Sequence, residues 1–150
     1  MKNKTKKIAI VTYNRVGEGQ YDNGLIKRDG KEIYIAQNGH RSAWAADSGP
    51  GYERNKIRRR TVKDVIQQIT LEDMNHIYLY VGAGGGEEAI RQTKDIPSEK
   101  ITYVMCGCNY SFKRNLIEEI GNSNAETISC ECGGRNTLER ILKQQLAGGK

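Results

Sequence analysis

Long hydrophobic runs are missing from this sequence. Apolar residues make up 37% of the chain and occur in short clusters, of which Ile8–Val11 is an example. Such a cluster is too short for a membrane span, which needs about 20 apolar residues, and too short for the core of a signal peptide. The pattern therefore predicts a folded chain that does not cross a membrane, and a cytoplasmic location.

The sequence also lacks the usual signatures of nucleotide-binding and catalytic sites. No Gly-Lys-Ser or Gly-Lys-Thr occurs, which excludes a Walker A loop. The run from Gly82 to Gly86 departs from the dinucleotide fingerprint G-x-G-x-x-G, because Glu87 stands at its last position. No set of nucleophile, base and acid is specific enough to name a reaction, so the sequence leaves open whether the protein is an enzyme.

Negative charge is in the minority. The chain has 24 Lys and Arg against 18 Asp and Glu, a net charge of +6 and a pI of about 9.2. A basic protein favours anionic partners, such as a nucleotide or another phosphorylated small molecule, a nucleic acid or acidic lipid head groups. Part of the excess lies in residues 1–7, which we expect to form a flexible basic tail.

The 150 residues are expected to form a single domain. A strand is predicted over residues 7–13, and Asp29-Gly30 between two apolar runs predicts a β-hairpin. Residues 61–147 then read as a helix followed by three strand–loop–helix units. Together these patterns predict an α/β fold: a Rossmann-like, mostly parallel sheet flanked by helices and extended by the N-terminal strand and the hairpin.

Two of the predicted helices have readable ends and faces. Gly121 is expected to end the helix that follows Asn109, and Asn136 is expected to cap the last helix together with Glu139. The first of these helices should bury an apolar stripe of Phe112, Leu116, Ile117 and Ile120. The last helix should bury Leu138, Ile141, Leu142 and Leu146.

A glycine-rich segment is the first candidate binding site. Gly84, Gly85 and Gly86 lie between a predicted strand and a predicted helix, where backbone N–H groups can face a phosphate. A plain turn that lets strand and helix pack closely is the alternative. If a nucleotide binds here, Arg41, Arg54 and Arg135 are expected to pair with its charge. The rings expected to cover its base are Tyr21, Trp44 and Tyr52.

The four cysteines form the second candidate site. Cys106 and Cys108 follow one predicted strand, and Cys130 and Cys132 follow the next. If these strands are neighbours, four thiolates gather at one sheet edge and can hold a structural Zn²⁺. Three alternatives remain open: buried reduced thiols, redox pairing of the cysteines, and a nucleophilic Cys108 in a C-x₅-R arrangement with Arg114.

The function that best fits these features is the binding of a nucleotide or another phosphorylated small molecule, for example a signalling nucleotide that is sensed or sequestered. One alternative is a hydrolase or transferase that acts on a nucleotide or phosphoester through His40 or Cys108. A second alternative is a zinc-stabilised module that binds nucleic acid or a partner protein. The sequence is compatible with a homo-oligomer.

Overall fold

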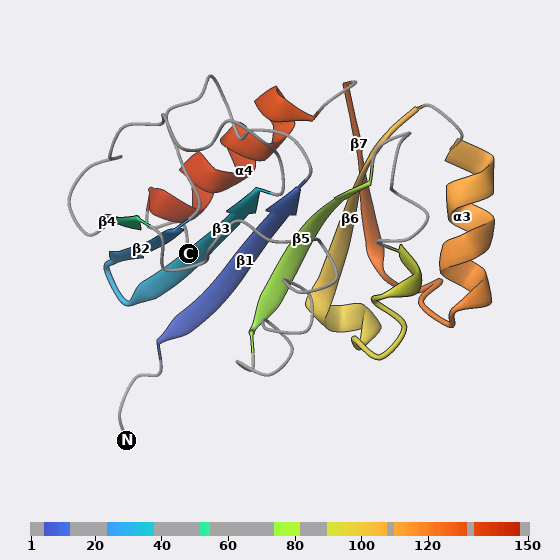
Figure 1. Cartoon of the computed structure of the whole chain (residues 1–150), viewed down its shortest axis with the longest axis horizontal. Helices are drawn as coiled ribbons and strands as arrows, with labels where there is room; N and C mark the ends of the chain where they lie inside the picture. The colour runs from blue at the N-terminus through green and yellow to red at the C-terminus, as the bar shows by residue number, and fades with distance from the viewer. Residues whose placement is uncertain are drawn as a thin grey trace.

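The computed structural model describes residues 5–12, 24–37, 52–54, 74–81, 90–107, 110–131 and 134–147. Its strands are β1 (Lys6–Thr12), β2 (Gly24–Arg28), β3 (Lys31–Gln37), β4 (Tyr52–Arg54), β5 (His76–Val81), β6 (Ile101–Cys106) and β7 (Glu126–Cys130). Its helices are α3 (Tyr110–Glu119), α4 (Arg135–Leu146) and the 3₁₀ turn η2 (Ser98–Lys100). The strands form one seven-stranded sheet in the order β4-β2-β3-β1-β5-β6-β7 (Figure 1).

The sheet is mixed but mostly parallel, as predicted. β1 pairs in parallel with β3 and β5, and β5, β6 and β7 continue the parallel arrangement. β2 is antiparallel to both β3 and β4. All six residues of β6 are buried, because this strand is covered on both faces. The α/β class is therefore confirmed.

The predicted hairpin is confirmed in detail. Asp29 and Gly30 join β2 to β3 with φ angles of 52° and 80°, which suits the type I′ turn of a two-residue hairpin. Because β3 also pairs with β1, the hairpin extends one side of the sheet and leaves β1 in the interior. Lys6 and Lys7, the last two residues of the predicted tail, are the first two residues of β1.

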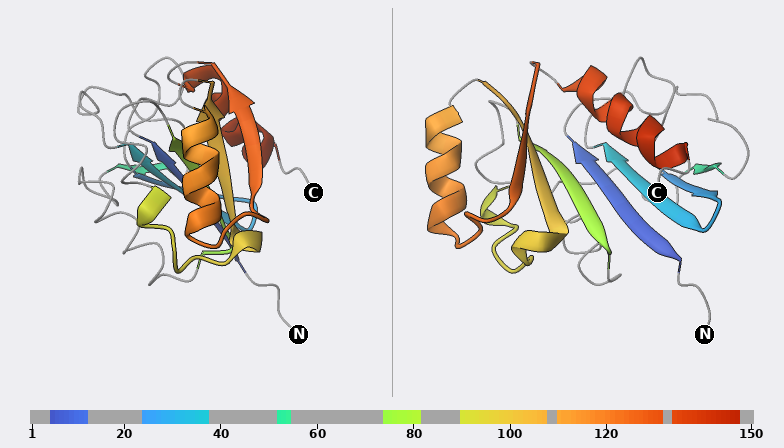
Figure 2. Two further views of the ribbon diagram at one scale, coloured as in Figure 1. Left: turned by 90° about the vertical axis from the view of Figure 1, so that its right-hand side faces the viewer. Right: turned by 180° about the vertical axis from the view of Figure 1, so that it is seen from behind.

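The two helices cover opposite faces of the sheet (Figure 2). Each face has its own apolar core. The core on the α3 side includes Ala9, Leu79, Tyr103, Leu116 and Ile117. The core on the α4 side includes Ile10, Ile35, Val104, Leu138 and Leu142. The buried stripe predicted for the last helix is confirmed, with Leu146 partly buried at its end.

The end of α3 follows the prediction, but its buried face does not. Gly121 has a φ of 90° and donates to Glu118, while the N–H of Asn122 donates to the carbonyl of Ile117, which is a Schellman arrangement. Phe112, predicted to point inward, is 52% exposed, and Lys113 is buried in its place. The positions 113, 116, 117 and 120 fit the helical period as well as 112, 116, 117 and 120 do.

The start of α4 differs from the prediction. The helix begins at Arg135 after Gly134, whose φ of 68° is left-handed, so Asn136 lies inside the helix and is not its cap. The cap is provided by Glu131, which accepts a hydrogen bond from the N–H of Asn136. Glu139, the expected partner of the cap, forms an ion pair with Lys143 at 3.3 Å.

Two other predicted helices are only partly covered by the described residues. The helix expected at the start of the 61–147 region lies outside them. Of the helix expected over residues 87–95, Ile90 and Arg91 are helical and residues 92–95 form turns. In the described part of the chain, no helix has the length and apolar character needed to span a bilayer.

Candidate ligand site at the carboxyl edge of the sheet

The carboxyl ends of the five parallel strands lie along one edge of the sheet, as the arrowheads in Figure 1 show. The strand order reverses direction at β1, because the chain places β3 on one side of β1 and later places β5 on the other. In open α/β sheets, ligands bind outside the carboxyl ends of the strands at such a reversal. The edge formed by β1, β5 and β6 is therefore the place where the topology favours a site.

Lys113 brings a buried positive charge to this edge. Its side chain extends from the first turn of α3, and the residue is 2% exposed. Its Nζ donates to the main-chain oxygens of Val81 and Cys106 at 3.4 and 3.3 Å, and lies 3.6 Å from Cys106 Sγ. Val81 and Cys106 are the last residues of β5 and β6, so the ammonium group lies across the carboxyl ends of two neighbouring strands.

These contacts are long for an ammonium group. Charge-assisted N–H···O bonds are typically about 2.7–2.9 Å, and a buried charge is stable only when it is paired and well hydrogen-bonded. Within the described ranges, no carboxylate forms an ion pair with Lys113. Among the described residues, the group therefore contacts two carbonyls and a thiol at long distances and has no counter-ion.

A second buried polar cluster on the α3 face shows how the chain satisfies neutral groups. The hydroxyl of Tyr103 lies 2.6 Å from Thr93 Oγ1, which donates to the carbonyl of Ile90 at 2.7 Å. Asn122 Nδ2 donates to the Tyr103 hydroxyl at 3.2 Å, and burial raises the pKa of Tyr103. The bonds between hydroxyls and carbonyl are short and no charge is involved, so this cluster is sufficiently explained by packing under α3.

Two exposed aromatic side chains stand beside the carboxyl edge. Tyr110 and Phe112 are 42% and 52% exposed, the only large apolar residues so exposed among those that the structure describes. Both lie in the first turn of α3, a few residues after the end of β6. Rings at this position are available to stack on a planar ligand.

The cysteine prediction depended on β6 and β7 being neighbours, and they are. The two strands pair in parallel with Cys106 directly opposite Cys130. Neither residue is in a disulfide. Cys108 and Cys132 lie outside the described residues, so the structure describes only two of the four cysteines of the predicted site, Cys106 and Cys130. Among described residues, no group of three His, Cys, Asp or Glu side chains could hold a metal ion.

The amino end of α4 is also at this edge, and the chain fills it with its own anion. Glu131 Oε2 accepts from the N–H groups of Asn136 and Thr137 at 2.7 and 3.4 Å, and Oε1 accepts from the Thr137 hydroxyl at 2.8 Å. Burial raises the pKa of Glu131, but these hydrogen bonds outweigh it and bring the pKa below its ordinary value. Arg135, predicted to meet an anion, is the exposed first residue of this helix.

A different polar cluster lies at the opposite, amino edge. His76 Nε2 is 2.7 Å from Thr102 Oγ1, which donates to Glu126 Oε1 at 3.1 Å, so the three side chains form a chain across β5, β6 and β7. The ring of Tyr78 is 4.9 Å from that of His76. Burial lowers the pKa of His76, and the charge of Glu126 opposes part of this shift.

The remaining predicted site residues are distributed as follows. Tyr52 and Arg54 belong to β4 at the far side of the sheet. Four strand spacings, or about 19 Å, separate β4 from β5, so the backbone of Arg54 is far from Val81. Six of these remaining residues lie outside the described part of the chain, namely Tyr21, Arg41, Trp44, Gly84, Gly85 and Gly86, and so does His40 of the hydrolase alternative.

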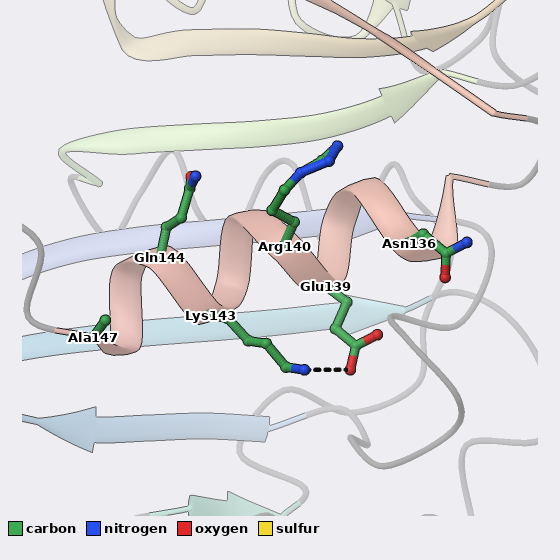
Figure 3. Close-up of a pocket in the computed structure, with 6 residues that line it drawn as sticks. All are labelled: Asn136, Glu139, Arg140, Lys143, Gln144 and Ala147. Atoms are coloured by element: carbon green, nitrogen blue, oxygen red, sulfur yellow. Dashed lines mark ion pairs between the residues drawn. The ribbon is translucent and has the colours of Figure 1, made fainter.

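A hollow runs along α4 from its first turn to its carboxyl end. Figure 3 shows Glu139 and Lys143 paired on one side of the helix, with Arg140 and Gln144 on the other. Asn136 and Ala147 lie at its two ends. Its described lining comes from one helix and its ion pair is internal, so the hollow shows no convergence of charge on a ligand.

Comparison with protein-family models, with curated proteins and with solved structures finds no match to this chain. The sequence analysis missed two parts of the site, Lys113 and Glu131. Lys113 could have been found because it falls at helical spacing from Leu116, Ile117 and Ile120, the core-facing positions of the helix. Glu131 could have been found because Gly134, which directly precedes the last helix, has no side chain to cap it.

Proposed function

We propose that the protein binds an anionic small molecule, a nucleotide or another phosphorylated compound, at the edge formed by β1, β5 and β6. The observation that carries this proposal is the buried ammonium group of Lys113, which contacts the last residues of β5 and β6. In the sequence, Val81 directly precedes the glycine-rich segment that begins at Gly82, so the ammonium contacts the residue that leads into this segment. A phosphate oxygen would offer it a shorter, charge-assisted hydrogen bond.

The topology supports the same place. Counted among themselves, the parallel strands have the order 2-1-3-4-5, which is that of the flavodoxin-like group of doubly wound, Rossmann-like sheets. In that group the ligand lies at the carboxyl end of the sheet, next to the first strand. The present chain departs from the pattern because an antiparallel strand, β2, stands between β1 and β3 in sequence.

The exposed rings of Tyr110 and Phe112 favour a nucleotide over a simple phosphorylated compound, since they provide flat apolar surface beside the charge. A signalling nucleotide that is held without being altered is one form of the proposal. A hydrolase or transferase that acts on the same ligand is the rival. Measuring turnover of the bound nucleotide distinguishes the two.

The direct test is a thermal-shift screen of linear and cyclic nucleotides on the wild type, Lys113→Met and Lys94→Met. Lys94 is exposed and serves as the matched control. A ligand present at 100 times its Kd adds about 2.7 kcal/mol to the stability of the wild type. Lys113→Met should weaken binding by about ten- to a hundredfold and Lys94→Met should not. If no nucleotide raises the melting temperature, or if both variants bind equally well, the proposal fails.

A zinc-stabilised module is the second candidate, favoured by the direct pairing of Cys106 with Cys130. The ammonium of Lys113 argues against it, because a divalent cation at Cys106 Sγ would lie close to a like charge. Metal analysis of the protein purified under reducing conditions decides. One Zn²⁺ per chain, lost in Cys130→Ser, supports the module, and metal-free protein removes it.

A further inference from the structure

Cys106 and Cys130 face each other at the ends of two neighbouring strands. Cys106 is the last residue of β6 and Cys130 the last residue of β7, and the two are register partners in this parallel pair (Figure 1). Neighbouring strands lie about 4.8 Å apart, and disulfides usually join residues whose Cα atoms are about 4.4–6.8 Å apart. The register therefore brings the two backbones within the range in which a disulfide forms without separating the strands.

Both side chains project from the face on which α4 packs. Val104 and Ile128, two residues earlier on the two strands, belong to the core on that side or pack against it. Side chains alternate between the two faces along a strand, so the cysteines two residues later share this face. Cys130 itself packs against the same core, and its Sγ lies 3.6 Å from the position of a Cβ at Gly134. Orientation as well as distance therefore suits a bond between the sulfurs.

The surroundings of Cys106 differ from those of a purely structural thiol. The residue is 2% exposed, yet among the described residues it belongs to neither apolar core. Its Sγ lies 3.6 Å from the ammonium group of Lys113. Inert cysteines are enclosed by apolar side chains, whereas reactive cysteines lie beside basic groups. The ammonium also disfavours a divalent cation at this sulfur, but it does not disfavour an uncharged disulfide.

The two thiols differ in exposure, which sets the order of a reaction at the pair. Cys130 is partly exposed, while Cys106 is buried. A dissolved disulfide therefore meets Cys130 first, and Cys106 needs contact only with the sulfur of its strand neighbour. A side chain at Gly107 would meet nothing within 4 Å, so the backbone next to Cys106 has room to adjust as the bond forms.

We propose that Cys106 and Cys130 form a reversible dithiol–disulfide site whose oxidant is a small-molecule disulfide. Cys130 attacks one sulfur of the reagent, forms a mixed disulfide and releases one small thiol. Cys106 then attacks the Cys130 sulfur, which forms the bond between the strands and releases the second small thiol. The two cysteines lose two protons and two electrons in total, and the reagent gains them as its S–S bond becomes two S–H bonds. An excess of the small thiol drives the same steps in reverse.

The test is incubation of the full chain with mixtures of oxidised and reduced glutathione, followed by thiol titration under denaturing conditions and intact-mass spectrometry. It uses Cys108→Ser/Cys132→Ser, in which Cys106 and Cys130 are the only thiols. Under oxidising mixtures the variant should lose both thiols and two hydrogen atoms, with no covalent link between chains. Excess reduced glutathione should restore both thiols. The melting temperature should rise on oxidation, because the bond also closes the loop that contains α3 in the unfolded chain.

Two further variants in this background serve as matched controls. Cys106→Ser retains the partly exposed Cys130, which should take up one glutathione and keep it, because no second thiol expels it. Cys130→Ser retains the buried Cys106, which should react with oxidised glutathione roughly tenfold more slowly or less readily still. Circular dichroism establishes that the variants are folded. In the wild type, the same oxidation should link the tryptic peptide that contains Cys106 to the one that contains Cys130, which keeps the test decisive if a variant does not fold.

Several results would overturn the proposal. These are oxidation that links separate chains, a Cys130 that keeps glutathione although Cys106 is present, a wild type without the link between the two peptides, and an oxidised protein that melts at a lower temperature than the reduced one. Purified protein that holds Zn²⁺ and is thereby protected from oxidation would also overturn it, and would support the zinc-stabilised module instead. No readout involves a nucleotide, so failure of the proposed ligand site leaves this result unaffected.

Discussion

The two sides of the carboxyl edge are built in opposite ways. Beside β7, the chain supplies its own anion: the carboxylate of Glu131 accepts three hydrogen bonds from the first turn of α4. Beside β5 and β6, it supplies a cation: Lys113 is buried with two carbonyls and a thiol around it. Both groups lie next to strand ends, but within the described part of the chain only the first has the partners that its charge requires.

This difference indicates where an external anion would be useful. Helix N-termini are common anion sites, yet at α4 the N–H groups are already engaged by Glu131. An added phosphate there would have to displace a carboxylate, whereas beside Lys113 it would replace weak contacts with strong ones. The α3 side, where Lys113 in the first turn of the helix contacts the strand ends, is therefore the better candidate.

The largest expected effect concerns the close packing of Gly134, at the start of α4, against Tyr80. Gly134→Ala should destabilise the protein by about 2–4 kcal/mol, because a Cβ in this left-handed conformation would lie 2.7 Å from Tyr80 Cδ1. Gly121→Ala is the matched control, since its φ of 90° is also left-handed but nothing lies within 4 Å. It should cost only about 1–2 kcal/mol. Urea unfolding measures both, and equal losses would contradict the close contact with Tyr80.

The next effect concerns the internal anion. Glu131→Ala should lower the unfolding free energy by about 1 kcal/mol at pH 7, the usual cost of losing a helix cap. Since the folded pKa of Glu131 lies below its ordinary value, this contribution is complete above the ordinary pKa and is lost as the pH falls through the folded pKa. Wild type and variant should converge in acid. Glu119→Ala, at an exposed position of α3, should show no such convergence.

Removing the buried cation, Lys113, should change the unfolding free energy in the opposite direction to removing Glu131. Lys113→Met removes a buried charge and keeps an unbranched apolar side chain, so the unfolding free energy should stay the same or rise by up to about 1 kcal/mol. Lys94→Met, at an exposed position, gives the baseline. A loss of stability well beyond that of Lys94→Met in urea unfolding would show that Lys113 is a structural residue, and the contrast between the two sides would disappear.

The structure also shows which features could be predicted from the sequence and which could not. The hairpin at Asp29-Gly30 and the stop at Gly121 were predictable because turn and cap chemistry is local. The position of β1 between β3 and β5 was not, since strand order depends on contacts distant in sequence. The exchange of Phe112 for Lys113 on the buried face of α3 was missed because hydrophobic periodicity assigns a lysine to solvent. A charged residue at a buried position of an otherwise apolar helix face, as Lys113 is, is the kind of departure from hydrophobic periodicity that is expected at functional sites.

The smallest expected effect concerns His76 at the amino edge. Measuring it separates the titration of His76 from that of Glu131 at the carboxyl edge. Burial lowers the pKa of His76, so protonation favours the unfolded state. Its contribution is complete above the ordinary value near 6.5 and is lost as the pH falls from there through the folded pKa. Because the ring is half exposed, solvent screening limits the change to roughly a few tenths of a kcal/mol. In His76→Gln, which retains a hydrogen-bonding group near Thr102, the decline below pH 6.5 should be absent, while the later decline due to Glu131 persists. If wild-type stability instead rises between pH 7 and 5.5 relative to this variant, the attraction between protonated His76 and Glu126 exceeds the cost of burial, and the amino edge already holds a complete ion pair.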